Sequence, residues 1–450
     1  MPKQIYLETL GCEKNRVDSE IMLAALRKHN YQLTDTPVSA HVIVLNTCAF
    51  VTAATEESID RILNLSDYKA TGQCEKLVVT GCLSQRYQDE LFSTIPELDG
   101  LLGSSNFEQI PFLISQIYNN PQHPQILISK KPHYTQYEKQ ERIQSTPQHF
   151  AYLKIAEGCS NMCSFCNIPY LRGRFSSRSI LSIVEELKTL LQQGVREINL
   201  LSQDTSSYGK DLTKNTDIAS LLSAISQVDG EHWIRIFYAY PNTFSEEALE
   251  IMASDPRFCR YLDMPFQHIN DGVLARMNRK ITTKEIYKKM DQIKKYLPDI
   301  ALRTTFIVGF PSETADRFKE LSDFVAEGHF DHIGVFAYSH EDNITSAKWG
   351  DPVPNALKRE RKEQLLEIQQ HISLKKNKSH IGKSLQVLVD GVSQESDLLI
   401  QGRTQYQGAN VDGLVYINEG EVRPMDFNMI EITDAHPYDL VGRAIHGNRE

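Results

Sequence analysis

The first part of the chain alternates short apolar runs with longer amphipathic stretches. The apolar runs are QIYLETL, HVIVLN and KLVVTG, at residues 4–10, 41–46 and 76–81. Their β-branched and leucine content is typical of buried parallel strands. A helical pattern follows at 18–30, where we expect Asp18 or Ser19 to cap the start of the helix. Strand–helix–strand repetition at this spacing predicts a small open α/β sheet.

A second alternating region begins at residue 151 and extends to about residue 350. We expect strands in its apolar runs, at residues 151–157, 196–203, 233–240, 261–268, 301–310 and 332–339. Helical stretches such as 179–194 and 282–297 separate them. These β/α units predict a full or partial parallel barrel, with functional groups at the carboxyl ends of the strands. The charged amphipathic stretch 356–377 is expected to form a packing helix that bridges domains.

The last part of the chain changes to short strands separated by Gly and Asp turns. We expect these strands at residues 383–392, 398–404, 413–420, 427–435 and 438–445. This pattern predicts a small antiparallel β-barrel, similar in build to an OB-fold. The predicted organisation is therefore α/β, with an N-terminal domain (1–120), a linker (121–144), a central barrel with its bridging helix (145–378) and a C-terminal barrel (379–446).

Charge and cysteine content narrow the classes of function. A formal net charge of −10 argues against a general nucleic-acid binder, including a DNA binder, and favours cationic partners. The N-terminal sequence MPKQIYLETLGCEKN lacks the features of a secretory signal, and no apolar run approaches the ~20 residues of a membrane-spanning helix. We therefore expect a cytoplasmic protein without a membrane partner, whose 8 cysteines are reduced and available to soft metals.

Three cysteines directly follow the three predicted strands of the first sheet: Cys12, Cys48 and Cys82. The carboxyl ends of the strands line the ligand crevice of an open α/β sheet, so these cysteines can converge. One such cysteine would carry little information, because cysteine is a common buried residue. Three of three favour a shared metal site over coincidence. Cys74 and Cys259 belong to no motif, and we expect them to be structural.

Three further cysteines, Cys159, Cys163 and Cys166, lie in a C-x3-C-x2-C spacing. A structural zinc site takes four protein ligands, yet the nearest downstream candidate for a fourth is His232. A four-iron cluster also normally takes four cysteines, so three leave one iron without a protein ligand. An electron carrier avoids such an open position, whereas a metal that binds a reactant requires it. The missing ligand therefore predicts a reactive cluster.

The C-x3-C-x-Phe-C motif after the first barrel strand resembles the signature of radical S-adenosylmethionine (SAM) enzymes. The resemblance implies that SAM chelates the open iron, with Phe165 near its adenine. It also implies that the reduced cluster splits SAM into methionine and a 5′-deoxyadenosyl radical, with the protein positioning and tuning the cofactor.

Other strand-end residues are candidates for contacts to SAM. The stretch TFIVGFPSET is similar to the family's Gly-x-Pro-x-Glu loop, which implies that Gly309 and Glu313 belong to the SAM site. Ser312 departs from that pattern, because the family carries a second glycine there. Gln203 and Asp204 follow a predicted strand and either hold the SAM amino or ribose groups or cap the next helix.

Basic residues near these motifs allow two interpretations. Arg172, Arg174 and Arg178 follow the second cysteine motif, where they either grip a carboxylate in bidentate fashion or form a solvated basic face. For His268, also at a predicted strand end, we expect a buried histidine with satisfied hydrogen bonds.

The combination of three domains and two cysteine triads resembles the methylthiotransferases of the radical SAM superfamily over nearly the whole chain. The resemblance implies a TRAM domain at the C-terminus and a second 4Fe-4S cluster on the N-terminal triad, whose open iron can bind a sulfur species. It implies two SAM molecules: one methylates the sulfur, and the other yields the radical that abstracts hydrogen from an unactivated carbon. A sulfur donor and a cellular reductant are implied as partners.

One branch of this family modifies adenosine in tRNA, and the other modifies the β-carbon of an aspartate in small-subunit ribosomal protein twelve. Residues 379–450 hold 5 Lys/Arg against 11 Asp/Glu, a balance of −6. An acidic barrel repels RNA phosphates and attracts a basic ribosomal protein. Local sequences resemble the ribosomal branch as well: LGCEKNRVDSE, AYLKIAEGC and LLSQDTSSYG.

We therefore predict a ribosomal protein aspartate methylthiotransferase. A tRNA adenosine methylthiotransferase is the first alternative. A non-catalytic iron–sulfur protein that binds RNA or assists assembly is the second.

Overall fold

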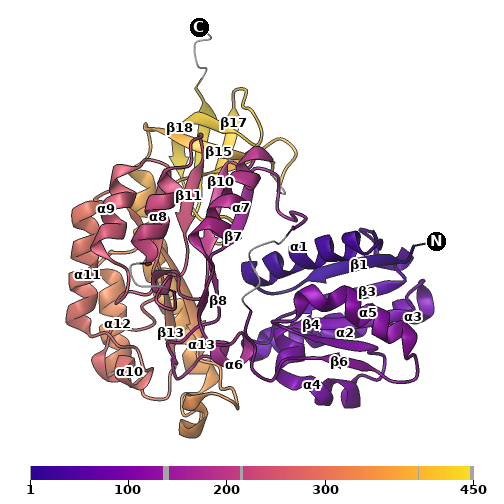
Figure 1. Cartoon of the computed structure of the whole chain (residues 1–450). Coiled ribbons are helices and arrows are strands. Elements are labelled where there is room, and N and C mark those ends of the chain that lie inside the picture. Colours follow the sequence, from indigo (N-terminus) through magenta and orange to yellow (C-terminus); the bar gives the residue numbers. More distant parts are fainter. Residues whose placement is uncertain (1, 135–140, 213–215, 394, 446–450) are drawn as a thin grey trace.

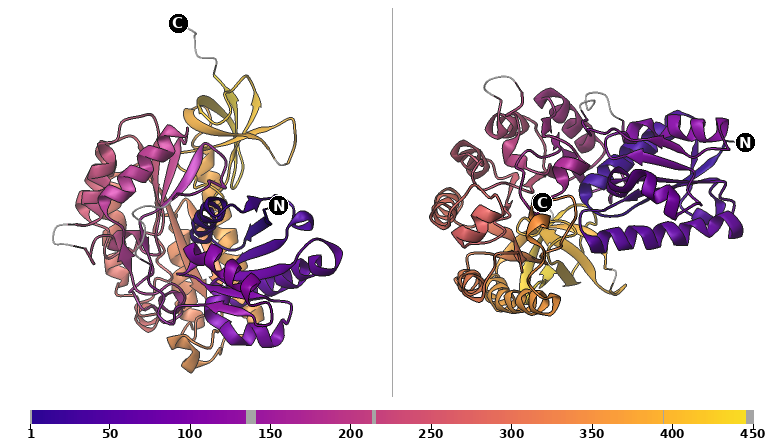
Figure 2. Two further views of the ribbon diagram at one scale, coloured as in Figure 1. Left: turned by 45° about the vertical axis from the view of Figure 1, so that its right-hand side comes forward. Right: turned by 90° about the horizontal axis from the view of Figure 1, so that it is seen from below.

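The computed structural model describes residues 2–134, 141–212, 216–393 and 395–445. Positions 135–140 of the predicted linker, 213–215 of the predicted central domain, and 394 and 446 of the predicted C-terminal barrel lie outside the described residues. The predicted fold class is confirmed, because two parallel sheets precede a closed β-barrel. The N-terminal sheet lies beside the central one and the barrel lies at one end of it (Figure 1; Figure 2).

The N-terminal sheet is entirely parallel, with the strand order β2-β1-β3-β4-β5-β6. Its strands are β1 (Gln4–Thr9), β2 (Gln32–Leu33), β3 (Val42–Thr47), β4 (Lys76–Gly81), β5 (Gly100–Gly103) and β6 (Gln125–Leu127). The three strands predicted from apolar runs are β1, β3 and β4. The edge strand β6 comes from the stretch that was predicted as a linker.

Helices cover both faces of this sheet: α1 (Glu13–Lys28), η1 (Pro37–Ser39), α2 (Thr52–Ser66), α3 (Tyr68–Thr71), α4 (Cys82–Thr94), η2 (Phe107–Gln109) and α5 (Ile110–Asn119). The predicted cap of α1 at Asp18 or Ser19 is wrong, because the helix begins at Glu13 with Cys12 as its N-cap. Both predicted caps are buried inside the helix.

The central sheet is an open, entirely parallel sheet in sequential order, β14-β13-β12-β11-β10-β7, and thus the partial form of the predicted barrel. Its strands match the six predicted runs: β7 (Phe150–Lys154), β10 (Glu197–Leu201), β11 (Trp233–Ile236), β12 (Phe258–Asp263), β13 (Ala301–Val308) and β14 (His332–Ala337). A short antiparallel pair, β8 (Ala156–Glu157) and β9 (Ser176–Ser177), flanks the cysteine loop.

The helices of this domain are α6 (Ile168–Leu171), α7 (Ile180–Gln192), η4 (Thr205–Ser207), α8 (Ile218–Ser226), α9 (Glu246–Ser254), α10 (Asp271–Arg276), α11 (Thr283–Tyr296), α12 (Ala315–Ala326), η5 (Thr345–Trp349) and α13 (Asn355–Lys378). The helices α7 to α13 pack on the outer face of the sheet, where their apolar sides complete one large core, whereas α6 packs against α4 of the N-terminal domain. As predicted, α13 bridges domains: it packs on α12 and β14 and also contacts β18 of the barrel.

The C-terminal barrel closes in the order β15-β16-β17-β19-β18. Its strands are β15 (Ser384–Val392), β16 (Ile400–Thr404), β17 (Val415–Glu419), β18 (Phe427–Ala435) and β19 (Leu440–Ala444). All neighbouring pairs are antiparallel except β17 and β19, which are parallel, so the barrel departs there from the expected all-antiparallel pairing. Across the described residues, no helix is both long and apolar enough to cross a membrane.

Candidate active site

The N-terminal cysteines lie at the carboxyl ends of three neighbouring strands. Cys12 follows β1 and caps α1, Cys48 follows β3, and Cys82 follows β4 as the first residue of α4. Gly11 has φ +85°, and a Cβ there would lie 2.7 Å from the Cβ and 3.2 Å from the Sγ of Cys48. The structure therefore brings the loop that carries Cys12 directly against Cys48.

Side-chain hydrogen bonds hold these loops in place. The Asn15 Nδ2 donates to the carbonyl oxygens of Leu10 (2.9 Å) and Thr47 (3.0 Å), which joins the end of β1 to the end of β3. The Ser58 hydroxyl donates to the carbonyl oxygen of Cys48 (2.7 Å) and accepts from the Cys48 N–H. The positions of the two loops are therefore set by buried polar contacts as well as by the sheet.

Burial opposes ionisation of two of these thiols, Cys48 and Cys82. It raises the pKa of Cys82 to about 12, against the attraction of the Arg172 guanidinium, and it raises the pKa of Cys48. Such groups become thiolates when a metal supplies the compensating charge, so the donor set fits iron chemistry. Within the described residues, no three His, Cys, Asp or Glu side chains are arranged to hold a single metal ion. The assignment of the six cysteines as ligands stays a prediction.

The second cysteine motif forms a compact loop between β8 and α6. The Cys166 N–H donates to the Cys163 carbonyl (3.1 Å), and the Cys159 N–H donates to the carbonyl of Gly173 (3.1 Å). Burial raises the pKa of Cys159 to about 11 and that of Cys166 further. Arg279, which the sequence analysis did not identify, places Nη1 3.8 Å from the Cys163 Sγ. This guanidinium therefore lies within hydrogen-bonding distance of one sulfur of the motif.

The loop that follows β13 is closed by its own glutamate. Gly309 has φ +74°, and its N–H donates to the Glu313 Oε1 (2.8 Å). Arg361 donates to the same oxygen (2.6 Å), and the other carboxylate oxygen meets the His268 Nε2 (3.2 Å). Glu313 thus holds the loop in shape in this structure, and its contact with SAM stays a prediction. The expected satisfied histidine at His268 is confirmed, since its Nδ1 also accepts from the Asn270 N–H (3.0 Å).

Phe165 lies close to this same loop. It packs against a small buried apolar cluster that includes Phe310, the neighbour of Gly309, together with Met277 and Tyr338. The structure therefore brings Phe165 of the cysteine loop and the Gly309 loop to one place, although they are far apart in the sequence.

The strand-end residues after β10 have two different roles. Asp204 caps η4: its carboxylate accepts from the Ser207 N–H (3.2 Å) and hydroxyl (2.6 Å), so the capping alternative is observed. The same carboxylate accepts from Asn161 (2.7 Å) and so ties down the cysteine loop. By contrast, the Oε1 atoms of Gln203 and Gln267 are buried without a hydrogen-bond partner among the described residues.

These unpartnered oxygens at the ends of β10 and β12 fit a polar cofactor with amino and hydroxyl donors, because buried polar atoms are normally paired. The sequence analysis did not identify Gln267. Its signal was its place directly after a predicted strand end, in the motif that contains His268.

The three arginines after the cysteine loop have different environments. Arg172 and Arg178 are buried and Arg174 is exposed. The prediction of a solvated basic face is therefore wrong for Arg172 and Arg178. Arg178 donates to the Lys154 carbonyl (2.7 Å) and pairs with Glu186 (2.6 Å). Both arginines therefore pair with protein carboxylates, but Arg172 meets Asp18 and Glu157 through Nη1 alone, so the expected bidentate grip is not observed there.

Arg172 belongs to a buried cluster of two cations and two carboxylates, here called the four-charge cluster: Asp18, Lys154, Glu157 and Arg172. Arg172 donates to Asp18 (2.7 Å) and Glu157 (3.2 Å). Lys154 donates to Glu157 (2.8 Å) and to Asp18. Burial opposes ionisation of Glu157, but the attraction of the two cations outweighs it and lowers the pKa to about 2. The cluster joins α1 of the first domain to both ends of the loop that carries the second cysteine triad.

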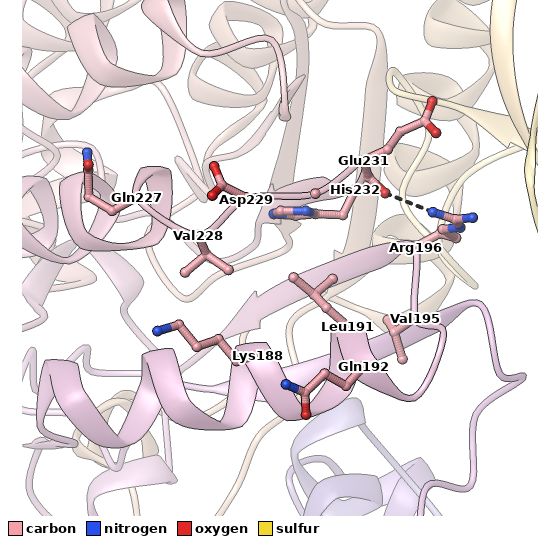
Figure 3. Close-up of a pocket in the computed structure, with 11 residues that line it drawn as sticks. Lys188, Leu191, Gln192, Val195, Arg196, Gln227, Val228, Asp229, Glu231 and His232 are labelled. Carbon is pink, nitrogen blue, oxygen red and sulfur yellow. Dashed lines mark hydrogen bonds between the residues drawn. The ribbon is translucent and has the colours of Figure 1, made fainter.

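A surface cavity of about 460 Å³ lies elsewhere, between α7 and the loop that precedes β11 (Figure 3). Arg196 and His232, which line it, directly precede β10 and β11. The cavity thus opens at the amino ends of the strands, whereas all six cysteines follow carboxyl ends. The cavity is therefore at the opposite ends of the strands from the cysteine triads and is not part of that site.

Comparisons with known proteins cover all three domains. A family model described as uncharacterized protein family UPF0004 matches residues 4–103. The radical SAM superfamily model matches residues 153–325, and a TRAM domain model matches residues 381–445.

Curated relatives match over the whole length. The chain is 42% identical over 443 residues to "Ribosomal protein uS12 methylthiotransferase RimO" of Geobacter sulfurreducens, covering 98% of this chain and 99% of the relative. The protein of the same name from Myxococcus xanthus is 44% identical, with 99% and 92% covered.

Solved structures share the fold at low sequence identity. The radical SAM methyltransferase TsrM from Kitasatospora setae, with cobalamin and a [4Fe-4S] cluster bound, has a TM-score of 0.59 at 13% identity over 77% of each chain. The cobalamin-dependent radical SAM enzyme OxsB has a TM-score of 0.52 at 13% identity, covering 81% of this chain and 56% of that one. These likenesses extend to the fold alone.

Proposed function

Because this chain belongs to the ribosomal protein uS12 methylthiotransferase family, a family of radical SAM enzymes, we propose that it transfers a methylthio group to the β-carbon of an aspartate in uS12. The observation that carries the proposal is 42% identity over 98% of the chain, which includes all three domains. Membership of the radical SAM superfamily implies SAM and iron–sulfur chemistry.

We assign one 4Fe-4S cluster to Cys12, Cys48 and Cys82. When bound, the two clusters and SAM supply the one-electron chemistry, a binding position for the incoming sulfur species and the methyl group. The chain's part is to hold each triad one thiolate short, so that each cluster keeps an open position. The hydrogen bonds of Asn15 and Ser58 support this assignment, because they fix the loops on which the first triad depends.

We assign the second cluster to Cys159, Cys163 and Cys166. When bound, SAM would be held by groups at the carboxyl ends of the central strands, with the Phe165 side chain and the tight turn at Gly309 as candidate neighbours. The unpartnered oxygens of Gln203 and Gln267, described above, are suited to accept hydrogen bonds from its amino and ribose groups.

The charge of the C-terminal barrel supports a basic protein partner. Its exposed acidic side chains, which lie on the barrel's loops and strand ends, are Glu395, Asp397, Glu419, Glu421 and Asp434. Acidic surfaces raise the rate of encounter with cationic partners and oppose the approach of nucleic-acid phosphates. We propose that this surface contributes to the capture of uS12.

A substrate comparison tests the function. The reconstituted full chain is incubated without oxygen with SAM, sulfide and a reductant, and is offered either uS12 or unmodified tRNA. Mass spectrometry should find a methylthio group on an aspartate of uS12 and none on tRNA. Methylthiolation confined to tRNA would overturn the proposal. Failure to form 5′-deoxyadenosine from SAM in a fully loaded preparation would favour a non-catalytic iron–sulfur protein.

A further inference from the structure

Lys14, two residues after Cys12, is a buried lysine without an acidic partner. It is 6% exposed, and among the described residues no ion pair or hydrogen bond joins its ammonium to a carboxylate. Its Nζ instead lies over the face of Tyr238, 3.0 Å from the ring centroid. The other two buried lysines are paired: Lys154 with two carboxylates, and Lys358 with Asp351 at 2.6 Å.

This placement is unfavourable for a cation on two counts. A buried charge without a partner loses its hydration and gains no ion pair in return. Lys14 is also the second residue of the 16-residue helix α1, whose N-terminus carries partial positive charge and disfavours cations. A cation–π contact offsets part of this cost. An apolar residue would serve packing better, so the position points to an anion that binds there.

The contacts of Lys14 place its ammonium between the first cysteine triad and the central sheet. Tyr238 follows β11, and its N–H donates to the carboxylate of Asp263 at the end of β12 (3.4 Å). Its hydroxyl donates to Glu13 (3.1 Å). Asp263 is in turn paired with Arg303 (3.3 Å). Both neighbouring carboxylates therefore have donors of their own.

Four charged or titratable groups face Lys14 from the elements around it: Cys12, Glu13, Asp263 and Arg172. Lys14 therefore lies beside the first cysteine triad and at the carboxyl ends of the central strands, where its ammonium rests on Tyr238. The only non-peptide anion that an aspartate substrate brings to this face is its own carboxylate.

We propose that Lys14 binds the side-chain carboxylate of the substrate aspartate and positions the adjacent β-carbon between the two cysteine triads. The inference rests on the proposed function. It makes Lys14 a specificity-determining residue. An ammonium and a carboxylate form a charge-assisted hydrogen bond, and the uncharged amide of an asparagine does not form an equally strong one. Adenosine offers no such group. Tyr238, on whose ring the ammonium rests, fixes its direction.

The test compares peptides that span the target site of uS12 and carry either Asp or Asn at the target position. Binding to the reconstituted full chain is measured by fluorescence anisotropy without oxygen. The wild type should bind the Asp peptide about 10- to 100-fold more tightly than the Asn peptide, the range that a hydrogen bond between charged groups supports.

Lys14→Met should bind the two peptides alike, at the affinity of the wild type for the Asn peptide, and Lys14→Arg should keep part of the preference. Lys319→Met is the matched control, because that lysine lies on α12 with its side chain 73% exposed, and it should bind as the wild type does. Iron content is measured for each variant, so that peptide affinities are compared at equal cluster loading, and Lys319→Met should also form 5′-deoxyadenosine at the wild-type rate. Lys14→Gln carries the same comparison if Lys14→Met does not fold.

An undiminished preference for the Asp peptide in Lys14→Met would overturn the inference. Equal weakening of both peptides would overturn it too, because it would mean that Lys14 serves the cluster charge rather than the substrate carboxylate. These outcomes leave the proposed function standing if the wild type methylthiolates the Asp peptide. Methylthiolation of tRNA alone would remove the proposed function and this inference with it.

Discussion

Removal of Arg172 should loosen the contact between the first domain and the second cysteine loop. The four-charge cluster is balanced, with two cations and two carboxylates whose side chains are at most 4% exposed. Arg172→Met leaves three charges, and one carboxylate of Asp18 or Glu157 then lacks a counter-ion. Breaking a buried pair in this way costs about 3–5 kcal/mol, which is much more than the pair contributes against an apolar replacement.

The effect should be local to the elements that the cluster joins. A cost of about 3–5 kcal/mol corresponds to a roughly 100- to 4,000-fold increase in local opening, at about 1.4 kcal/mol for each factor of ten. Hydrogen exchange followed by mass spectrometry should show it in peptides from α1 and from β7. Peptides from β18, in the C-terminal barrel, should exchange at the wild-type rate. Arg174→Met removes an exposed neighbour and is the matched control.

A double variant separates charge balance from simple loss of contacts. Asp18→Leu combined with Arg172→Met leaves Lys154 and Glu157 as a neutral pair. The double variant should therefore cost about 1–3 kcal/mol less than the sum of the two single variants. The reasoning is refuted if Arg172→Met exchanges within threefold of the wild type, or if the two single effects simply add.

Three further predictions concern the barrel, the first cluster and SAM. Burial opposes ionisation of Glu197, but the attraction of two buried arginines outweighs burial and lowers the pKa of Glu197 below 4.5. The ion pairs of Glu197 therefore stabilise the fold above about pH 4.5, and this stabilisation is lost as the pH falls below that value. In a Trp349→Phe background the fluorescence of Trp233, whose ring packs against the barrel, should change below pH 4.5, and a flat signal from pH 5 to pH 3 contradicts this. Cys82→Ala should reduce iron from about eight to about four per chain, whereas complete loss of iron would argue against two independent clusters. Gln267→Ala should weaken SAM binding about tenfold at unchanged iron content, and unchanged affinity by equilibrium dialysis would exclude the contact.

Apolar patterning was sufficient for the main strands, because short apolar runs rich in β-branched residues and leucine are typical of buried parallel strands. It did not predict β2, β5 or β6, which are only 2–4 residues long. Such short strands form because the edge of a neighbouring strand is available for pairing, and the local sequence does not contain that information. The parallel pairing of β17 with β19 is likewise a property of barrel closure.

The candidate site shows the same division. The cysteines could be grouped from the sequence, because each follows a strand end and parallel strands share that edge. The pairing of Arg172 with Asp18 could not be predicted from the sequence, since Asp18 is 154 residues away and belongs to another domain. Asp18 looked like a helix cap because aspartate is common there, but the helix begins five residues earlier and turns Asp18 inward. Docking of the domains, rather than local propensity, decides its role.

Helix α1 explains how two triads on separate domains can act on one substrate. Its N-cap is Cys12 and its first turn carries Lys14, which rests on Tyr238 of the central domain. Its second turn carries Asp18, which is paired with Arg172 just beyond the second cysteine motif. A single rigid helix therefore fixes the distance from the first triad to the second and the direction of the cation between them. Any change that rotates α1 should disturb all three together, because no flexible segment separates them.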